Sequence, residues 1–155
     1  QIGTTQTNFG YNGSVSWYRC ENGAGGASHT ATANFSGSGS FPSIYFVELT
    51  GVAAASFDVT AQNNDNSSPF TVTSPTLGQA DEIVLAIVGT NSGDNPVVYA
   101  ESTGFTVIDS ETNGTTSYVG YFVYKIVAAT TAVTPSFTAS NGTQSVVFLA
   151  TFKKA

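Results

Sequence analysis

The stretch Tyr118–Lys153 reads YVGYFVYKIVAATTAVTPSFTASNGTQSVVFLATFK and decides the fold class of this chain. It holds three runs rich in aromatic and β-branched residues, separated by segments rich in Ala, Thr, Asn and Gly. Such runs are typical of strands, so we predict strands over Tyr118–Val127, Val133–Thr138 and Val146–Phe152. Because Asn141-Gly142 tolerates positive φ, it predicts a β-hairpin between the last two of these strands.

The rest of the chain carries the same strand signals and almost no helix signal. Further strands are predicted over Ser14–Cys20, His29–Ser36, Ile44–Leu49, Ser56–Thr60, Phe70–Thr73, Ile83–Val88 and Phe105–Ile108. Ile83–Val88 is apolar without interruption, which indicates a strand covered on both faces. The only helix candidate is the short segment Val52–Ala55, and the polar segments Ala61–Pro69 and Thr90–Pro96 are predicted to be exposed loops. Many short strands with polar turns predict an all-β, antiparallel sandwich or barrel.

The chain also contains a weak internal repeat. Ile2–Arg19 aligns without a gap on Ile108–Lys125, and Asn34–Leu49 aligns on Ser136–Thr151 at a slightly different offset. Matching positions hold aromatic and aliphatic residues, which predicts a β-structure with two pseudo-repeated halves. The counterpart of Asp81–Val107 would precede the first residue. We therefore expect the opening strands of the first half to be missing, leaving a sheet edge or groove unfilled beside the N-terminal sheet.

Length and composition predict one β-sandwich domain over residues 1–155. Charged residues make up 9% of the chain, well below the roughly one quarter typical of soluble domains. Ten acids against four bases give a net charge of −6. This balance argues against nucleic-acid binding, because phosphate contacts need Lys or Arg. No hydrophobic run is long enough to span a membrane, so no membrane contact is expected.

Two basic residues and one thiol have simple interpretations. The adjacent pair Lys153-Lys154 is the only local concentration of positive charge, and we interpret it as a solvated end. Cys20 is the only cysteine, so it cannot form an intrachain disulfide. We expect it to be a small buried hydrophobic residue in a strand.

Residues that could carry catalysis are few and scattered. His29 is the only histidine and no GxSxG motif is present, which argues against a Ser-His-Asp triad and a zinc site alike. Asp81 and Glu82 are neighbours entering a strand and should face opposite sides. Glu48 interrupts an apolar run, so an inward carboxylate is conceivable there, although outward exposure is the simpler interpretation. The sequence therefore predicts that the protein is not an enzyme.

Calcium is the ion that the polar loops suit best, although we expect no cofactor. The available oxygen ligands are Asn63, Asn64, Asp65, Asn66, Asn91, Asp94 and Asn95. Calcium takes six to eight oxygens, typically with several carboxylates, whereas each loop supplies one Asp and neither has the EF-hand spacing. Plain turn-rich loops are therefore the simpler interpretation.

Aromatic side chains provide the candidate interaction residues. Tyr118, Phe122 and Tyr124 fall on one face of their predicted strand, and Trp17 and Tyr18 adjoin in another. A strand with aromatics on both faces is either covered on both sides or exposes a platform on which sugar rings can stack. Trp17, Tyr18, Tyr118 and Tyr124 are therefore candidate glycan-binding or interface residues, with packing in the core or between subunits as the first alternative.

The chain resembles a β-sandwich module found in bacteriophage structural and decoration proteins and in bacterial surface proteins. The matching pattern is an A-D-E-I-V strand, an aromatic-T-x-I segment, an aromatic strand ending in Y-K, an alternating strand and a final apolar strand. These segments are Ala80–Val88, Phe105–Ile108, Tyr118–Lys125, Val133–Phe137 and Ser145–Phe152. Residues Trp17–Gly51 are similar to the earlier portion of the module. The resemblance implies a jelly-roll-like fold, no catalytic residues and a role at a particle or cell surface.

Residues and resemblance together predict a non-enzymatic virion structural protein. The expected role is a phage capsid decoration (cement) or fibre subunit that acts by oligomerisation and surface attachment, at the virion surface or outside the cell. A homo-oligomer is expected, with a trimer favoured, in contact with capsid or other particle proteins. One alternative is a carbohydrate-binding or host-receptor-binding module that contacts cell-surface glycan. Another is an extracellular filament subunit, in which a neighbour donates the missing strand.

Overall fold

The regular secondary structure of the described residues consists of strands alone. The computed structural model describes residues 1–9, 13–21, 23, 28, 30–34, 44–91, 98–110, 118–140 and 144–155. The strands are β1 (Ile2–Phe9), β2 (Gly13–Trp17), β3 (Val52–Asp65), β4 (Phe70–Thr71), β5 (Glu82–Asn91), β6 (Tyr99–Glu101), β7 (Thr106–Ser110), β8 (Tyr118–Val127), β9 (Ser136–Ala139) and β10 (Ser145–Lys154). All pair antiparallel, which confirms the predicted all-β, antiparallel fold.

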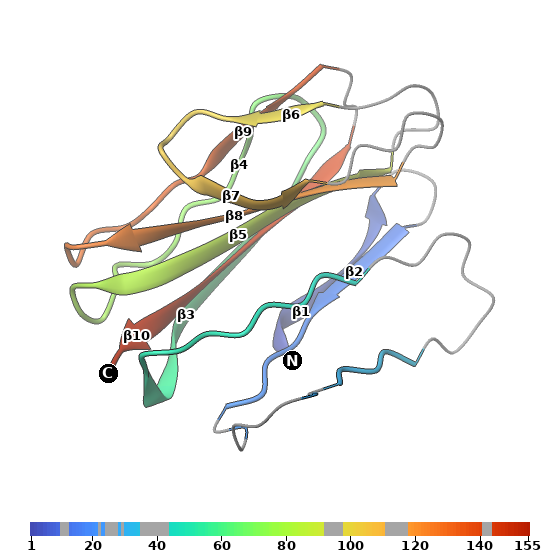
Figure 1. Ribbon diagram of the computed structural model, residues 1–155. Helices are drawn as coiled ribbons and strands as arrows, with labels where there is room; N and C mark the ends of the chain where they lie inside the picture. Colours follow the sequence, from blue (N-terminus) through green and yellow to red (C-terminus); the bar gives the residue numbers. More distant parts are fainter. Residues whose placement is uncertain are drawn as a thin grey trace.

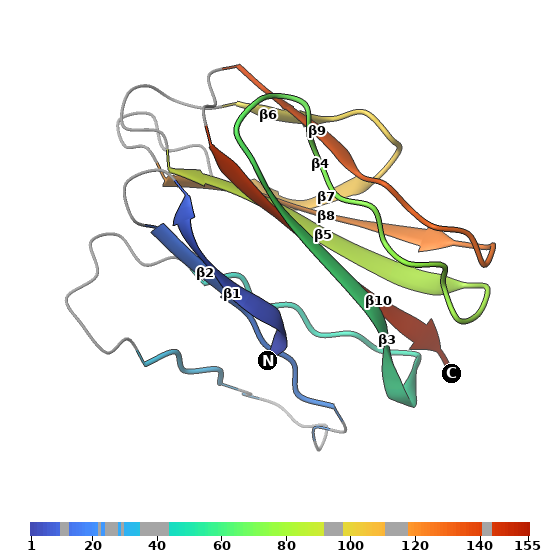
Figure 2. The ribbon, with the colours of Figure 1, turned by 180° about the vertical axis from the view of Figure 1, so that it is seen from behind.

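A five-stranded sheet in the order β3-β10-β5-β8-β7 forms the centre of the molecule (Figure 1). The three-stranded sheet β4-β9-β6 lies on one side of it. The β1-β2 hairpin and the extended residues 44–50 lie on the other side, as the view from behind also shows (Figure 2). The central sheet is therefore covered on both faces, and the fold is a β-sandwich with an added outer layer.

The core accordingly has two parts, one on each face of the central sheet. Val84, Ala86 and Val88 of β5 pack with the three-stranded sheet, whereas Leu85 packs with residues of the β1-β2 hairpin. Alternate residues of one strand thus enter different cores, as the period of two in a strand requires. The prediction that Ile83–Val88 is covered on both faces is confirmed. Burying a Leu or Val side chain completely contributes about 1.5–3 kcal/mol, so β5 stabilises both layers.

Residues 44–50 run extended beside the hairpin without being part of a sheet ladder. Tyr45, Val47 and Leu49 are half-buried and pack on the same core as Leu85, while the residues between them are exposed. Of this alternation the sequence predicts only the outward position of Glu48, because every other residue from Ile44 to Leu49 is apolar or aromatic. The predicted strand is nevertheless absent from the described residues, because side-chain packing on the sheet face, and not a ladder, holds the segment in place.

Other predictions need correction. The hairpin around Asn141-Gly142 is wrong: β9 pairs with β4 and β6, whereas β10 pairs with β3 and β5, so the chain crosses between sheets. Asn141 and Gly142 themselves lie outside the described residues. An Asn-Gly pair indicates that the chain can reverse direction, but it does not indicate which sheet the next strand joins.

The predictions for two other segments also fail. Val52–Ala55 is part of β3 and not a helix, and the same strand continues to Asp65 through the first half of the predicted loop Ala61–Pro69. Residues 30–34 are exposed and outside any strand, although their alternation predicted a half-buried one. His29 and residues 35–36 of that prediction lie outside the described residues. Alternation shows that a segment can fit a sheet face, but a strand also needs a neighbour.

The jelly-roll topology and the two-half repeat stay predictions. The first repeat block corresponds to an antiparallel pair in each copy, β1-β2 and β7-β8. The second block is unequal in the described residues, because residues 44–49 form no ladder while their counterparts in β10 pair with a strand on each side, β3 and β5.

Candidate functional site

Trp17 packs between the β1-β2 hairpin and the central sheet. Its ring meets Phe122 of β8 edge-on, with the centroids 6.1 Å apart, and Phe148 of β10 in the same manner at 6.4 Å. Edge-to-face pairs of this kind contribute about 0.5–1.5 kcal/mol each beyond the area that they bury. The half-buried ring therefore fastens the outer layer to the sheet.

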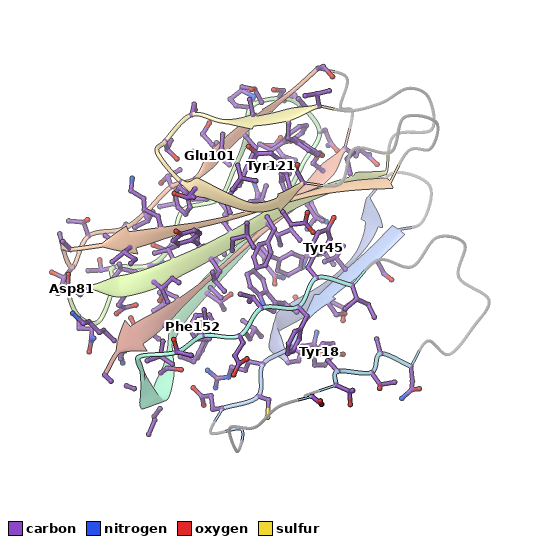
Figure 3. The ribbon with its side chains drawn as sticks, in the orientation of Figure 1. Tyr18, Tyr45, Asp81, Glu101, Tyr121 and Phe152 are labelled. Atoms are coloured by element: carbon purple, nitrogen blue, oxygen red, sulfur yellow. The ribbon has the colours of Figure 1, made fainter. Side chains whose placement is uncertain are left out.

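The other candidate aromatics do not gather in one row. Tyr18 follows β2 and is 66% exposed, whereas Tyr124 of β8 is half-buried against the core that contains Leu85. The side chain of Tyr118 lies outside the described residues. Figure 3 shows Tyr45 between its own segment and the central sheet, where its ring meets Phe122 edge-on at 6.1 Å. Tyr18 is thus the candidate that the described structure presents to solvent.

The edge strand β7 presents apolar side chains to solvent. All five of its residues are exposed, and Val107 and Ile108 are 45% and 38% exposed. Among the described residues β7 pairs only with β8, so its outer edge carries backbone groups without a strand partner. The register to β8 also shifts between Val107 and Asp109, which marks a bulge. An exposed edge with apolar side chains is a template for pairing with another chain.

A second set of exposed apolar side chains lies on the outer layer. Ile44 and Phe46 alternate with the half-buried residues of their segment, and Phe46 is 64% exposed. Tyr18 belongs to the same layer, whereas Tyr121 lies on the opposite face of the central sheet against Phe137 (Figure 3). The outer layer therefore offers solvent several large apolar groups.

Two acids and a lysine meet near the end of β10, a cluster that the sequence analysis did not find. Lys153 Nζ lies 2.9 Å from Asp58 Oδ1, and the Gly78 amide donates to Asp58 Oδ2 at 2.6 Å. Burial raises the pKa of Asp58, but hydrogen bonds from Lys153, from the Gly78 amide and with Glu82 outweigh it and hold the pKa below its ordinary value. Lys153 is thus an ion-pair partner, and its interpretation as part of a solvated end is wrong.

Glu82 completes this cluster from the start of β5. Its side chain is fully buried. Oε1 accepts a hydrogen bond from the Gln79 amide at 3.0 Å, and Oε2 accepts none from the described residues. Asp81 beside it is exposed, so the two neighbours face opposite sides as predicted. The signal in the sequence was a glutamate placed directly before a continuous apolar strand, a position that becomes buried when the strand is covered on both faces.

Glu101 holds the connection between β6 and β7. Its Oε1 accepts hydrogen bonds from the hydroxyl and the amide of Thr103, and its Oε2 accepts one from the Phe105 amide at 3.0 Å. Lys125 Nζ, close by on β8, donates to the Thr103 carbonyl at 2.8 Å. The sequence does not single out Glu101, because its partners are mostly backbone groups that no residue pattern reveals.

The remaining candidate residues are exposed, close a turn, or lie outside the described residues. Glu48 is exposed, which agrees with the simpler of its two interpretations. Asp65 Oδ1 accepts a hydrogen bond from the Asn66 amide at 2.8 Å and so closes a turn. Cys20 is exposed and follows β2, so the prediction of a buried strand residue is wrong. His29 lies outside the described residues. Within the described ranges, no three His, Cys, Asp or Glu side chains gather as a metal site would require.

The comparisons with known proteins are sparse. No protein-family model and no curated protein matches this chain. Among solved structures, the chain is similar to one titled "Structure of the tripod (BppUct-A-L) from the baseplate of bacteriophage Tuc2009", with 15% identity and a TM-score of 0.39 over 84% of this chain and 82% of that one. A similarity at this TM-score carries no argument about the function of this chain. No helix in the described residues is long and apolar enough to cross a membrane.

Proposed function

We propose that this chain is a non-enzymatic structural protein of a phage particle, a capsid decoration or fibre subunit that works by forming a homo-oligomer and attaching to other particle proteins. A trimer is the favoured oligomer, and the place of action is the virion surface. The observation that carries the proposal is the edge strand β7, with five exposed residues that include Val107 and Ile108. A second copy that pairs with this edge would satisfy its backbone groups and cover both side chains.

The surroundings of the acids support a structural role. Four of the acids each accept a hydrogen bond from a backbone amide. The pairs are Glu21 with Phe57, Asp58 with Gly78, Glu82 with Gln79, and Glu101 with Phe105. A carboxylate used in this way closes turns and joins strands. The sequence resemblance to phage structural and bacterial surface modules supports the choice of a particle.

The oligomer is tested by light scattering coupled to size-exclusion chromatography. Val107→Lys places a charge on the edge of β7, and edge lysines oppose pairing between sheets. The matched control is Val98→Lys, because Val98 is 56% exposed and precedes β6 in the other sheet. We expect wild type and Val98→Lys to be oligomers and Val107→Lys to shift towards the monomer, with an unchanged far-ultraviolet circular dichroism spectrum.

Attachment to a particle needs its own measurement. Mass spectrometry of purified particles should find the chain as a stoichiometric component, and the purified protein should bind particles that lack it. A wild-type monomer at every concentration, without affinity for any particle, would contradict the proposal.

Glycan binding is a second candidate, favoured by the exposure of Tyr18 together with Ile44 and Phe46 on the outer layer. Aromatic rings at a surface can stack on sugar rings. A glycan array probed with wild type and Tyr18→Ala tests this function. Hits that depend on Tyr18 would support it, and an array without hits would exclude it.

A further inference from the structure

A cleft opens near the C-terminal end of β8. It has a volume of about 240 Å³ and is lined by Thr103, Phe105, Lys125, Val127, Thr131, Ala132, Val133 and Thr134. Its walls come from β8, from the connection between β6 and β7, and from the connection between β8 and β9, which lie close together in Figure 1. None of the aromatic candidates considered above belongs to this cleft.

Lys125 brings an uncompensated positive charge to the cleft. Arg19 lies 3.6 Å from Glu21, and Lys153 pairs with Asp58, but no carboxylate of the described residues lies within 4.0 Å of Lys125. One N–H of its ammonium donates to the Thr103 carbonyl, which leaves two for another acceptor. Glu101, the nearby acid, already accepts hydrogen bonds at both oxygens.

The remaining lining is divided between hydroxyls and apolar surface. Thr103, Thr131 and Thr134 supply hydroxyl groups. The Thr103 hydroxyl already donates to Glu101, and the Thr134 hydroxyl hydrogen-bonds to Thr73 at 2.9 Å. Phe105, Val127 and Val133 supply apolar surface that is continuous with the core. Binding sites for small ligands combine an apolar lining with a few polar groups in this way.

We propose that the cleft binds one sugar ring that carries a single carboxylate, such as a hexuronic acid. The carboxylate would pair with Lys125, the ring hydroxyls with the threonines, and the C–H face of the ring with the apolar lining. The volume is below the roughly 300 Å³ at which sites for drug-sized ligands begin, so one ring is the matching size. The net charge of −6 disfavours ligands with several negative charges.

Nuclear magnetic resonance titration of the protein with D-glucuronate tests the proposal. D-Glucose is the matched neutral ring, and acetate is the carboxylate without a ring. A ligand of this size is expected to bind with a dissociation constant in the millimolar range. We expect shifted signals at Lys125 and Thr131 with glucuronate, and binding at least about tenfold weaker with glucose or acetate.

Lys125→Gln removes the charge and keeps an N–H that can donate to the Thr103 carbonyl. Lys154→Gln, at an exposed position outside the cleft, makes the same change in net charge. Glucuronate affinity should fall at least about tenfold in the first variant and stay unchanged in the second. If Lys125→Gln does not fold, Thr131→Val on the exposed rim replaces it and should weaken binding several-fold.

Three results would overturn the proposal. The first is that the wild type does not bind glucuronate even at concentrations well above the millimolar range. The second is that acetate binds as tightly as glucuronate. The third is that Lys125→Gln and Lys154→Gln lose the same amount of glucuronate affinity. These titrations do not depend on light scattering, so they test glucuronate binding independently of the proposed oligomer.

Discussion

Glu101 closes the connection between β6 and β7 with both of its carboxylate oxygens. Burial raises its pKa, but hydrogen bonds from Thr103 and from the Phe105 amide outweigh the burial, so the pKa lies below its ordinary value of 4.5. A lowered pKa in the folded state contributes stability that is present above the unfolded-state pKa and is lost as the pH falls through the folded-state pKa. This single side chain therefore links the shape of the connection to pH.

Glu101→Gln should lower the free energy of unfolding by about 1–2 kcal/mol at neutral pH, because the amide replaces a charged acceptor of backbone N–H groups. The difference from wild type should shrink as the pH falls below 4.5, where wild-type Glu101 becomes protonated. Urea unfolding at a series of pH values measures it. Asp81→Asn is the control, because Asp81 is an exposed acid that lies outside β7. A difference that is independent of pH would contradict this account of Glu101.

Gly78 leaves space for the carboxylate of Asp58. A Cβ at Gly78 would lie 2.6 Å from Oδ1 and 2.9 Å from Oδ2 of Asp58, the atoms that bind Lys153 and the Gly78 amide. Gly78→Ala should therefore lower the free energy of unfolding by about 1–3 kcal/mol. Gly23→Ala is the matched control, since a Cβ there meets no atom of the described residues within 4 Å, and its effect should stay within about 0.5 kcal/mol. Equal effects of the two substitutions on chemical unfolding would refute the steric explanation.

At the scale of elements, a glycine in β8 makes room for residues 44–50. A Cβ at Gly120 would overlap the hydroxyl of Tyr45 and lie 2.7 Å from its Cζ and 2.9 Å from its Cε2. The segment is held by such packing and not by a sheet ladder. The position of residues 44–50 on the central sheet therefore depends on the absence of a Cβ at Gly120.

Gly120→Ala should displace Tyr45 and loosen this segment, with a loss of about 1–3 kcal/mol in the free energy of unfolding. In a Tyr45→Ala background the clash is gone, so the same substitution should cost under about 0.5 kcal/mol. The four proteins of this double-mutant cycle are compared by urea unfolding and by the rate of proteolysis within residues 44–50. Additive effects would show that Gly120 and Tyr45 act independently.

Strands of the central sheet and of the outer layers were both largely predictable from the sequence, since β2, β4 and β9 also overlap predicted strands. β8 has the predicted bounds, and β5 and β10 extend their predicted ranges by a few residues. β1 was missed because IGTTQTNF is polar, and β6 because three residues show no period. For the candidate site, the exposure of the Tyr18 and Glu48 side chains could be predicted from the sequence. The Asp58–Lys153 pair could not, since it depends on which strands become neighbours.

At the scale of the whole molecule, the distribution of charge governs how copies meet. Each copy carries a net charge of −6 with charged residues at only 9%, so two copies repel each other at long range. The surface proposed for pairing, β7, offers Val107 and Ile108 with one acid, Asp109. Attraction between copies must therefore come from apolar contact and backbone hydrogen bonds, neither of which salt screens.

Oligomer formation should accordingly be unchanged or strengthened as salt rises. The Debye length falls from about 10 Å at 0.1 M to about 3 Å at 1 M, so the repulsion between copies is screened while the apolar contact at β7 remains. Sedimentation equilibrium of the wild type at low, physiological and molar sodium chloride measures the dissociation constant, and Val107→Lys should stay dissociated throughout. An oligomer that dissociates as salt increases would show that opposite charges hold it together, and the four basic residues of each copy would then be the place to look for the interface.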